Sequence, residues 1–313
     1  MLFHSRLFNV AYEKDNLLFK LKSVDVATKS GVITFEADFF IDCTGDGDLF
    51  ALSGCDYQLG REKDNLCQPM TTCFRICGVE TETFWREKTK LQEIYKELQR
   101  EGKIINPREN LLEFTMDKEK GIVHLNTTRV LKYNPTDVFD LSKAEIEGRR
   151  QVAEMFEFLR KYSEGCKNAS LVSIAPEIGI RESRKLKGVH ILTVDELYNK
   201  VYFDDTIALG NYPVDIHNPE GSGTVMHNFK DDEFYCIPYR SLLPKEYSNL
   251  LVAGRCISAT HEAQAAIRVM NICACLGQAA GSGVALAYKT TKNVHTIRTD
   301  DLRNILINNG ACL

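Results

Sequence analysis

The stretch FFIDCTGDGDLFALSG, Phe39–Gly54, places glycines directly after an apolar run, as a phosphate-binding turn does. Such a turn follows a G-x-G-x-x-G pattern between a strand and a helix and holds a diphosphate on backbone N–H groups. Here GDGDLF has two of the three glycines, and Asp46 and Asp48 stand where the phosphate would lie. At roughly 4 Å and an effective dielectric constant near 20, each carboxylate would repel a phosphate by about 4 kcal/mol. We therefore expect no primary diphosphate site here, and expect both carboxylates to accept N–H groups where the next helix begins.

The other glycine-rich segments of the sequence do not supply the missing pattern. GSGTVM at 221–226 and GSGVAL at 281–286 both lack the third glycine, and neither follows an apolar strand. The sequence therefore contains no primary dinucleotide-binding fingerprint.

Metal and disulfide chemistry find little support in the sequence. Asp215 and His217 have metal-ligand chemistry, but no third ligand accompanies them. The eleven cysteines are odd in number, and their closest pairs lie two and four positions apart, which is not C-x-x-C spacing. We expect no metal, and we expect mostly buried, reduced thiols, as in a cytosolic protein.

The composition is that of a soluble globular protein of roughly two domains. The 313 residues are 44% hydrophobic and 26% charged, with a net charge of -4, which gives no reason to expect nucleic acid or an anionic membrane as a partner. No apolar run reaches the roughly 20 residues that span a bilayer. The N-terminus lacks the pattern of a signal peptide, so we expect a cytoplasmic protein.

The elements that position the opening stretch are predicted as strands. Apolar residues alternate through 17–28, and TKSG at 28–31 predicts a hairpin turn. Residues 39–41 form a short apolar run typical of a strand buried on both faces. A short helix over 49–52 should then end at Gly54.

Helices and a second buried strand are predicted further along the chain. Helices are expected over 81–102 and from Ser142, as N-cap, to Gly165, and TVDE at 193–196 is a capping box. Residues 250–253 predict a buried strand that ends at Gly254, followed by a helix rich in alanine, glycine and cysteine, which could pack very close to a sheet or a flat ligand. We expect a final helix over 300–307, with Thr299 as N-cap.

Four segments together resemble one family. FIDCTGDGDLFALSGCDYQLGRE is similar to the second conserved segment of FAD-dependent oxidoreductases of the glutathione-reductase structural class. PEIGIRESRKLKG, NYPVDIHNPEGSGT and the long segment from IPYRSLLPKEYSNLLVAGRC to GQAAG resemble later segments of that family, in the same order. The resemblance covers nearly the whole chain.

The resemblance implies an α/β fold. It implies an incomplete Rossmann-like FAD-binding domain with a β-meander, formed by residues 1–60 and 222–313, and an α+β substrate or cap domain over 61–221. The family's first strand, glycine turn and helix, which hold the ADP half of FAD, have no counterpart in this sequence. Because that strand is central in the family's sheet, we expect unpaired backbone on the strand beside it.

The resemblance also implies which residues contact FAD. Thr44 and Gly45 would lie near the nucleotide half. Gly254 would allow close approach of the ribityl chain, and Arg255 could pair with a phosphate. A second set, just before the small-residue helix, comprises Arg268, Val269, Met270 and Asn271. The N-terminus of that helix would stabilise the pyrimidine end of the reduced flavin.

The candidates for substrate chemistry are His217, His261 and Arg181. A flavin oxidoreductase needs an acid or base and a cationic anchor near the reacting carbon, and these residues lie inside the matching segments. Arg184 and Arg240 are expected to be ion-pair partners instead.

The reaction implied is hydride transfer between a small organic substrate and N5 of FAD. Two alternatives stay open: a truncated or split subunit that needs a partner for the ADP-binding half, and a non-catalytic remnant that binds no flavin. The partner could supply the ADP-binding half, or the chain could form a homo-oligomer. We expect no nucleic-acid or membrane partner.

Overall fold

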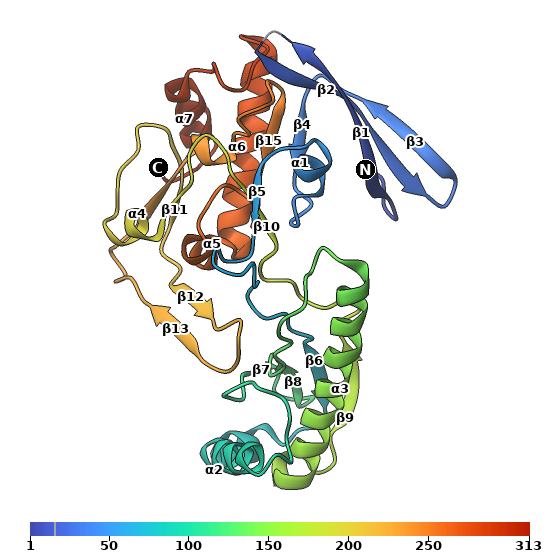
Figure 1. Cartoon of the computed structure of the whole chain (residues 1–313). Coiled ribbons are helices and arrows are strands. Elements are labelled where there is room, and N and C mark those ends of the chain that lie inside the picture. Colours follow the sequence, from blue (N-terminus) through green and yellow to red (C-terminus); the bar gives the residue numbers. More distant parts are fainter. Residues whose placement is uncertain (16) are drawn as a thin grey trace. The chain divides into compact units, whose positions relative to one another are not determined.

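The computed structural model describes residues 1–15 and 17–313 and groups them into two compact units (Figure 1). Unit 1 comprises Met1–Asn65, Glu182–Ile216 and Met226–Leu313. Unit 2 comprises Leu66–Arg181 and His217–Val225.

The boundaries of the units differ from those predicted, because residues 182–216 group with the terminal segments and not with the middle of the chain. Strand pairing is the physical reason. β10 (Arg184–Leu186) pairs antiparallel with β5 (Tyr57–Leu59), and β11 (Thr206–Gly210) pairs antiparallel with β14 (Tyr235–Pro238). Because of these hydrogen bonds between distant segments, residues 182–216 belong to unit 1.

Unit 1 begins with the predicted three-stranded meander. β1 (Arg6–Asp15), β2 (Leu18–Thr28) and β3 (Gly31–Glu36) form an antiparallel sheet in the order β1-β2-β3. The tight turn between β2 and β3 lies at the predicted TKSG position, where Gly31 has a φ of 104°.

The two predicted buried strands lie side by side as a parallel pair (Figure 1). β4 (Phe40–Asp42) pairs with β15 (Leu250–Val252), in a register that sets Phe40 opposite Leu250. Among the described residues this sheet has two strands, so no strand pairs with the second edge of β4. The expected open edge beside β4 is therefore present.

The helices of unit 1 follow the predicted order, with one additional helix at His261–Ile267 that was not predicted. The capping box at Thr193 is confirmed, because its hydroxyl accepts from Glu196 N–H while the Glu196 side chain accepts from Thr193 N–H. The N-cap of the last helix is Arg298 and not Thr299, which is already helical. The helices are α1 (Asp48–Leu52), α4 (Val194–Tyr198), α5 (His261–Ile267), α6 (Met270–Lys289) and α7 (Thr299–Asn308).

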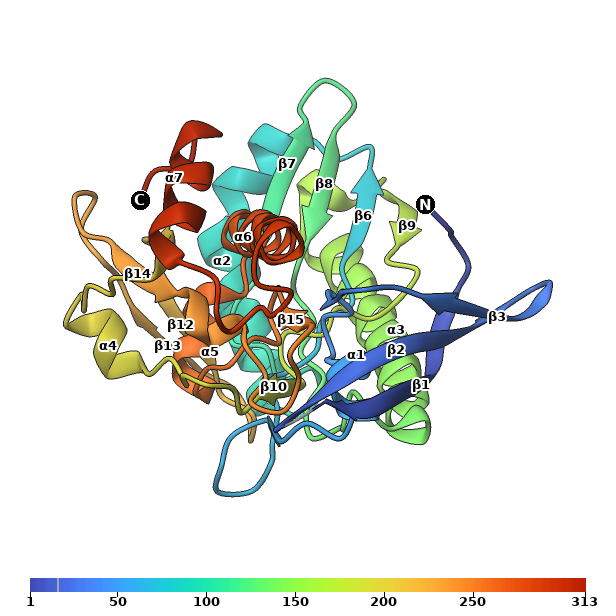
Figure 2. The same ribbon diagram turned by 90° about the horizontal axis from the view of Figure 1, so that it is seen from above.

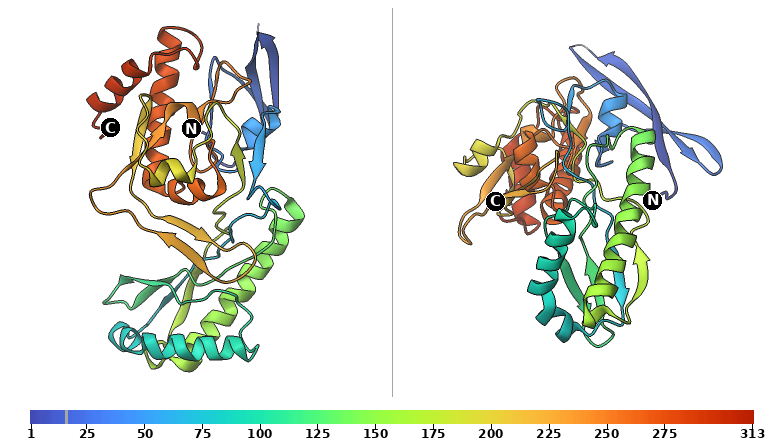
Figure 3. Two further views of the ribbon diagram at one scale, coloured as in Figure 1. Left: turned by 60° about the vertical axis from the view of Figure 1, so that its left-hand side comes forward. Right: turned by 60° about the horizontal axis from the view of Figure 1, so that its bottom comes forward.

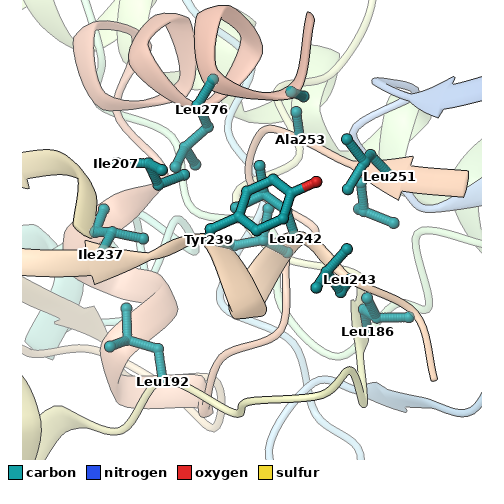
Figure 4. Close-up of a cluster of buried hydrophobic side chains, with 14 of the residues drawn as sticks. Leu186, Leu192, Ile207, Ile237, Tyr239, Leu242, Leu243, Leu251, Ala253 and Leu276 are labelled. Carbon is teal, nitrogen blue, oxygen red and sulfur yellow. The ribbon is translucent and has the colours of Figure 1, made fainter. Parts of the chain in front are cut away.

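The core of unit 1 is built from both ends of the sequence and its middle. Tyr239, in the 3₁₀ helix η2 (Tyr239–Leu242), lies at the centre of the cluster drawn in Figure 4, with Leu251 and Leu276 among the side chains around it. Gly283 of α6 packs on the ring of Tyr239, and an added Cβ there would lie 3.1 Å from the ring. Figure 2 shows α7 beside α6. The predicted close packing of the small-residue helix is thus visible at Gly283.

Helix α6 is long and apolar enough to cross a membrane by length and composition, with a mean hydropathy of 1.3. This differs from the expectation that no segment would qualify. A third of the qualifying window is buried inside the protein, and its side chains are mainly small, as in a helix that packs closely.

Unit 2 contains an antiparallel sheet in the order β7-β8-β6-β9, with two long helices beside it (Figure 3). Its apolar core draws on the sheet and on both helices. The elements are β6 (Phe74–Cys77), α2 (Thr81–Arg100), β7 (Glu113–Asp117), β8 (Ile122–Leu125), α3 (Val138–Tyr162), η1 (Glu164–Cys166) and β9 (Ser170–Ile174). The hairpin of β12 (Val214–His217) and β13 (Thr224–His227) has residues 217–225 grouped with unit 2.

The start of α3 corrects the sequence prediction. Asp137 is the N-cap, because its carboxylate accepts from the N–H groups of Phe139 and Asp140. The hydroxyl of Ser142 donates instead to the carbonyl of Val138, one turn earlier. Val138 and Phe139 in this first turn are apolar but exposed, so the apolar pattern of the sequence does not indicate where the helix begins.

Candidate functional site

The turn of the opening stretch is organised by Asp42, at the end of β4. Its carboxylate is fully buried and accepts from the N–H and hydroxyl of Thr44, at 2.9 and 2.7 Å, and from the N–H of Phe50 at 3.0 Å. Burial raises the pKa of Asp42, and these hydrogen bonds oppose that shift. Asp42 therefore has the N–H-accepting role that the sequence analysis gave to Asp46 and Asp48.

Asp46 and Asp48 instead pair with cations from distant segments. Asp46 accepts from Arg255 Nη2 at 2.8 Å and from the hydroxyl of Ser183 at 2.6 Å. Asp48 pairs with Arg184 at 2.9 Å. The prediction of their partners was wrong, because these pairings depend on the fold. The prediction that Arg184 is an ion-pair partner is confirmed, as is that for Arg240, which binds both carboxylate oxygens of Asp205.

Two glycines lie next to Arg255: Gly45 of the turn, which contacts its side chain, and Gly254, which precedes it in the sequence. Gly45 has a φ of 80°, and a Cβ there would lie 2.4 Å from Arg255 Nη1, so the guanidinium lies directly against the backbone. Gly254 has a φ of 100°, and a Cβ there would meet nothing within 4 Å, so there is open space beside it. Thr44, Gly45, Gly254 and Arg255 thus lie around one place in unit 1.

Two arginines near the first turn of α6 have spare donors. Arg255 Nε and Arg268 Nε are buried and have no hydrogen-bond partner in the described part of the chain. Arg268 also donates to a carboxylate oxygen of Asp215 at 3.2 Å. Burial raises the pKa of Cys273 in this turn, and the charges of both arginines act against that shift.

The start of α6 adds further unpaired donors. Met270 and Asn271 were predicted to lie just before this helix, but they are its first two residues, because the helix begins earlier than expected. Val269 is the N-cap and has no side-chain hydrogen bond to the first turn. Met270 is 86% exposed, and Asn271 is exposed as well. A helix N-terminus carries about half a positive charge and free N–H groups. Because a buried donor without an acceptor costs about 1–3 kcal/mol, this surplus of donors fits a ligand that is anionic or rich in acceptors.

His261, the first residue of α5, belongs to a buried network that the sequence analysis missed in part. Its Nδ1 lies 2.8 Å from the carboxylate of Glu182, and Lys185 Nζ lies 2.5 Å from the same carboxylate. Burial alone would raise the pKa of Glu182, but the hydrogen bond from His261 and the charge of Lys185 lower it below its usual value. The signal in the sequence was Glu182 itself, which stands between the two arginines of RESR.

His217 has a different environment in unit 2. Its Nδ1 lies 3.1 Å from Nη2 of the fully buried Arg129 and 3.1 Å from the hydroxyl of Thr224. Arg129 also donates to Glu109 and to the carbonyls of Gly221 and Gly223. An arginine only donates, so His217 Nδ1 accepts and the ring proton lies on Nε2. Protonating Nδ1 would place a second cation against Arg129.

The third catalytic candidate, Arg181, donates to the carbonyl of Pro69 at 2.6 Å and to the hydroxyl of Thr71, within unit 2. In the described part of the chain no group of three or more His, Cys, Asp or Glu side chains is arranged to hold a metal ion. All eleven cysteines are free thiols.

Unit 1 combines a parallel strand pair, a β-meander and a donor-rich helix start, and this combination fits a Rossmann-like flavoprotein fold. The model of the FAD dependent oxidoreductase family matches residues 1–306. The chain therefore belongs to this family of flavoenzymes, whose cofactor is FAD. Comparison with curated proteins gives no match.

Three solved structures are similar to the chain at a low level. BexE, from a study of oxidation during BE-7585A biosynthesis, has 12% identity and a TM-score of 0.37, with 96% of this chain and 41% of that chain covered. The OxyS anhydrotetracycline hydroxylase from Streptomyces rimosus has 13% identity and a TM-score of 0.27, with coverages of 59% and 30%. CabE, an aromatic hydroxylase from angucycline biosynthesis, has 8% identity and a TM-score of 0.33, with coverages of 96% and 47%. The chain spans less than half the length of each, and likeness at this level supports no statement about substrate.

Proposed function

We propose that this chain forms the flavin-facing part of an FAD-dependent oxidoreductase of the glutathione-reductase structural class. FAD would accept or donate a hydride at N5, and the other reactant would be a small organic molecule. The observation that carries the proposal is the pair of buried donors, Arg255 Nε and Arg268 Nε, near the uncapped start of α6.

Each residue of this cluster has a defined task in the proposal. Arg268 and the N–H groups of the first turn of α6 would donate to the acceptor-rich pyrimidine edge and stabilise its negative charge. Arg255 would pair with a phosphate, and Gly254 would leave room for the ribityl chain. Thr44 and Gly45 would lie toward the nucleotide half. No geometry of FAD itself is needed for these assignments.

We propose in addition that the ADP-binding half is supplied from outside this sequence, by a further segment or by a partner polypeptide. The sequence contains no G-x-G-x-x-G element, and β4 has an edge with no strand beside it in the described part of the chain. The N–H of Phe40 donates to the carbonyl of Asn249, and the carbonyl of Asp42 accepts from the N–H of Ala253. Because alternate residues of a parallel strand direct their N–H and C=O groups to the same edge, those of Ile41 face the open one. A strand added there would satisfy those groups.

Reconstitution tests the function against its alternatives. The chain is refolded with excess FAD, alone and together with a co-expressed strand–glycine-turn–helix unit, and bound flavin is read from its absorption spectrum. The proposal predicts weak binding alone and stoichiometric yellow protein with the added unit. A protein that stays colourless in both conditions would establish the non-catalytic remnant. Stoichiometric binding by the chain alone would refute the need for a partner.

We also propose that the protein is cytoplasmic and binds neither nucleic acid nor membrane. A net charge of -4 fits a protein that binds neither nucleic acid nor an anionic membrane, and eleven free thiols fit a reducing cytoplasm.

A further inference from the structure

We propose that Glu182 is the residue that positions His261 for proton transfer at Nε2, and that Lys185 keeps Glu182 in place. The proposal rests on the oxidoreductase function proposed above. It adds to that function two residues, Glu182 and Lys185, that do not touch the reacting atoms.

The three side chains form a buried network within unit 1. Their residues are 0%, 1% and 7% exposed for Glu182, Lys185 and His261. Lys185 Nζ contacts Glu182 Oε1 at 2.5 Å and donates to the carbonyl of Gly60 at 2.7 Å. A buried ion pair is stable only when its polar atoms are satisfied, because desolvation of each charge costs several kcal/mol. Each of these charges has its partners in the network.

The network determines which nitrogen of His261 carries the proton. The charge of Lys185 favours the ionised carboxylate, and an ionised carboxylate only accepts hydrogen bonds. His261 Nδ1, 2.8 Å away, is therefore the protonated nitrogen, and Nε2 carries the lone pair. Nε2 has no hydrogen-bond partner in the described part of the chain, and it is not among the side-chain atoms sealed from solvent.

The tautomer of His261 is the opposite of that of His217. In His217 the proton lies on Nε2, because Nδ1 faces the donors of Arg129. His261 has a basic nitrogen that is not sealed from solvent and a carboxylate partner for the imidazolium, whereas the basic nitrogen of His217 faces Arg129. In the proposed step a substrate O–H or N–H gives its proton to Nε2, and the electron pair stays on the substrate atom. The Nδ1–H bond to Glu182 is kept throughout.

The tautomer can be measured directly, without substrate and without flavin. Long-range ¹H–¹⁵N correlation spectra of the ¹⁵N-histidine-labelled full chain, at a pH where the ring is neutral, distinguish the two forms. The His261 signals are assigned by their loss in His261→Gln. The wild type is expected to show the Nδ1–H form. A wild-type Nε2–H form would overturn the proposal.

Glu182→Gln gives the sharper test. Lys185 must take the amide oxygen, so the amide NH₂ faces His261 Nδ1 and the tautomer ratio inverts toward Nε2–H. If this variant does not fold, Glu182→Leu/Lys185→Met removes the buried pair together, and the Nδ1–H preference should again be lost. Arg240→Ala, which breaks a different ion pair of unit 1, should leave the spectrum unchanged. An unchanged Nδ1–H form in a folded Glu182 variant would show that Glu182 does not position the ring.

The outcome is separable from that of the proposed function. A colourless protein with the predicted tautomer would contradict flavin binding and leave the positioning intact. A flavin-binding protein with the wrong tautomer would contradict the positioning alone.

Discussion

At the scale of single residues, Asn249 joins the meander of unit 1 to the parallel strand pair. Its fully buried side chain accepts from Leu21 N–H at 2.9 Å and donates to the carbonyls of Leu21 and Asp38 at 2.9 and 2.8 Å. Asn249 thus satisfies backbone groups that lie more than 200 residues away in the sequence.

We predict that Asn249→Ala destabilises the protein by about 3 kcal/mol, because buried backbone groups lose their partners. The free energy of unfolding is measured by denaturant titration. Asn309→Ala is the control: that side chain is exposed and makes one hydrogen bond, to Ile305, and its removal should cost less than about 0.5 kcal/mol. Equal effects of the two substitutions would contradict the role given to Asn249.

His124 of unit 2 gives a prediction for pH. Burial, and then the charge of Arg75 on the adjacent strand, lower the pKa of His124 below 6.5, and its Nδ1 is buried without a partner. The folded state therefore favours the neutral ring. This stability is fully present above pH 6.5 and is lost as the pH falls from there toward the lower folded pKa.

The loss should be absent in His124→Phe. The free energy of unfolding, compared at pH 7.5 and 5.5, should fall with pH more steeply in the wild type than in this variant. Replacing the exposed His4 by Gln should leave the wild-type slope unchanged. The same slope in wild type and His124→Phe would refute the assignment.

Residue types in a sequence show which chemistry is available but not which side chains are partners in the folded protein. The resemblance pointed to Arg255, Arg268 and His261, and all three lie in polar clusters of unit 1. Glu182 and Asp42 were missed because their importance comes from burial and from partners that only the fold supplies. Asp46 and Asp48 were assigned the wrong partners for the same reason.

At the scale of elements, the glycine turn before α1 shows how backbone and core are coupled. Gly47 has a φ of 69°, and an added Cβ would lie 2.1 Å from the ring of Phe50, which is fully buried. Gly54, just after α1, has a φ of 77° but open space around its Cα. The two glycines share the left-handed conformation and differ in packing.

This contrast predicts that Gly47→Ala is more damaging than Gly54→Ala. Both variants lose about 1–2 kcal/mol to the left-handed conformation, and Gly47→Ala should lose about 1–3 kcal/mol more through overpacking against Phe50. Denaturant unfolding of the two variants measures the difference directly. If Gly54→Ala is as destabilising as Gly47→Ala, the contact with Phe50 does not matter.

Element positions were predictable where a local signal exists. The turn at 28–31, the buried strands and the capping box of α4 depend on short-range patterns, and the structure contains all of them. The N-cap of α3 was placed five residues too late, at Ser142 instead of Asp137, because the first turn of the helix is exposed and apolar. Tertiary context, and not propensity, determines such ends.

At the scale of the whole molecule, the chain folds as two units whose segments alternate along the sequence. The sequence predicts a terminal domain of residues 1–60 and 222–313, whereas residues 182–216 also group with unit 1 in the structure. That segment joins unit 1 through pairing of β10 with β5 and of β11 with β14. Such pairing between distant segments leaves no local mark, so boundaries of this kind cannot be read from a single sequence.

The organisation of unit 2 shows the same dependence on distant contacts. Arg129, fully buried, donates to the carbonyls of Gly221 and Gly223 at 3.1 and 2.8 Å. Residues 217–225 are therefore bound to unit 2 in part by a side chain whose sequence position is about ninety residues away. Nothing in the sequence around Arg129 indicates this.

The central claim is that unit 1 holds FAD, with its isoalloxazine end at Arg268 and the start of α6 and a phosphate at Arg255. The most direct measurement is a titration of the purified chain with FAD, up to millimolar concentration, followed by flavin fluorescence. We predict saturable quenching in the wild type and unchanged affinity for FAD in Arg240→Ala. In Arg255→Ala and Arg268→Ala the affinity should be at least about tenfold weaker, because a hydrogen bond from a charged donor contributes about 1.5–3 kcal/mol. Absence of saturable quenching in the wild type, or equal affinities in all four proteins, would contradict the claim.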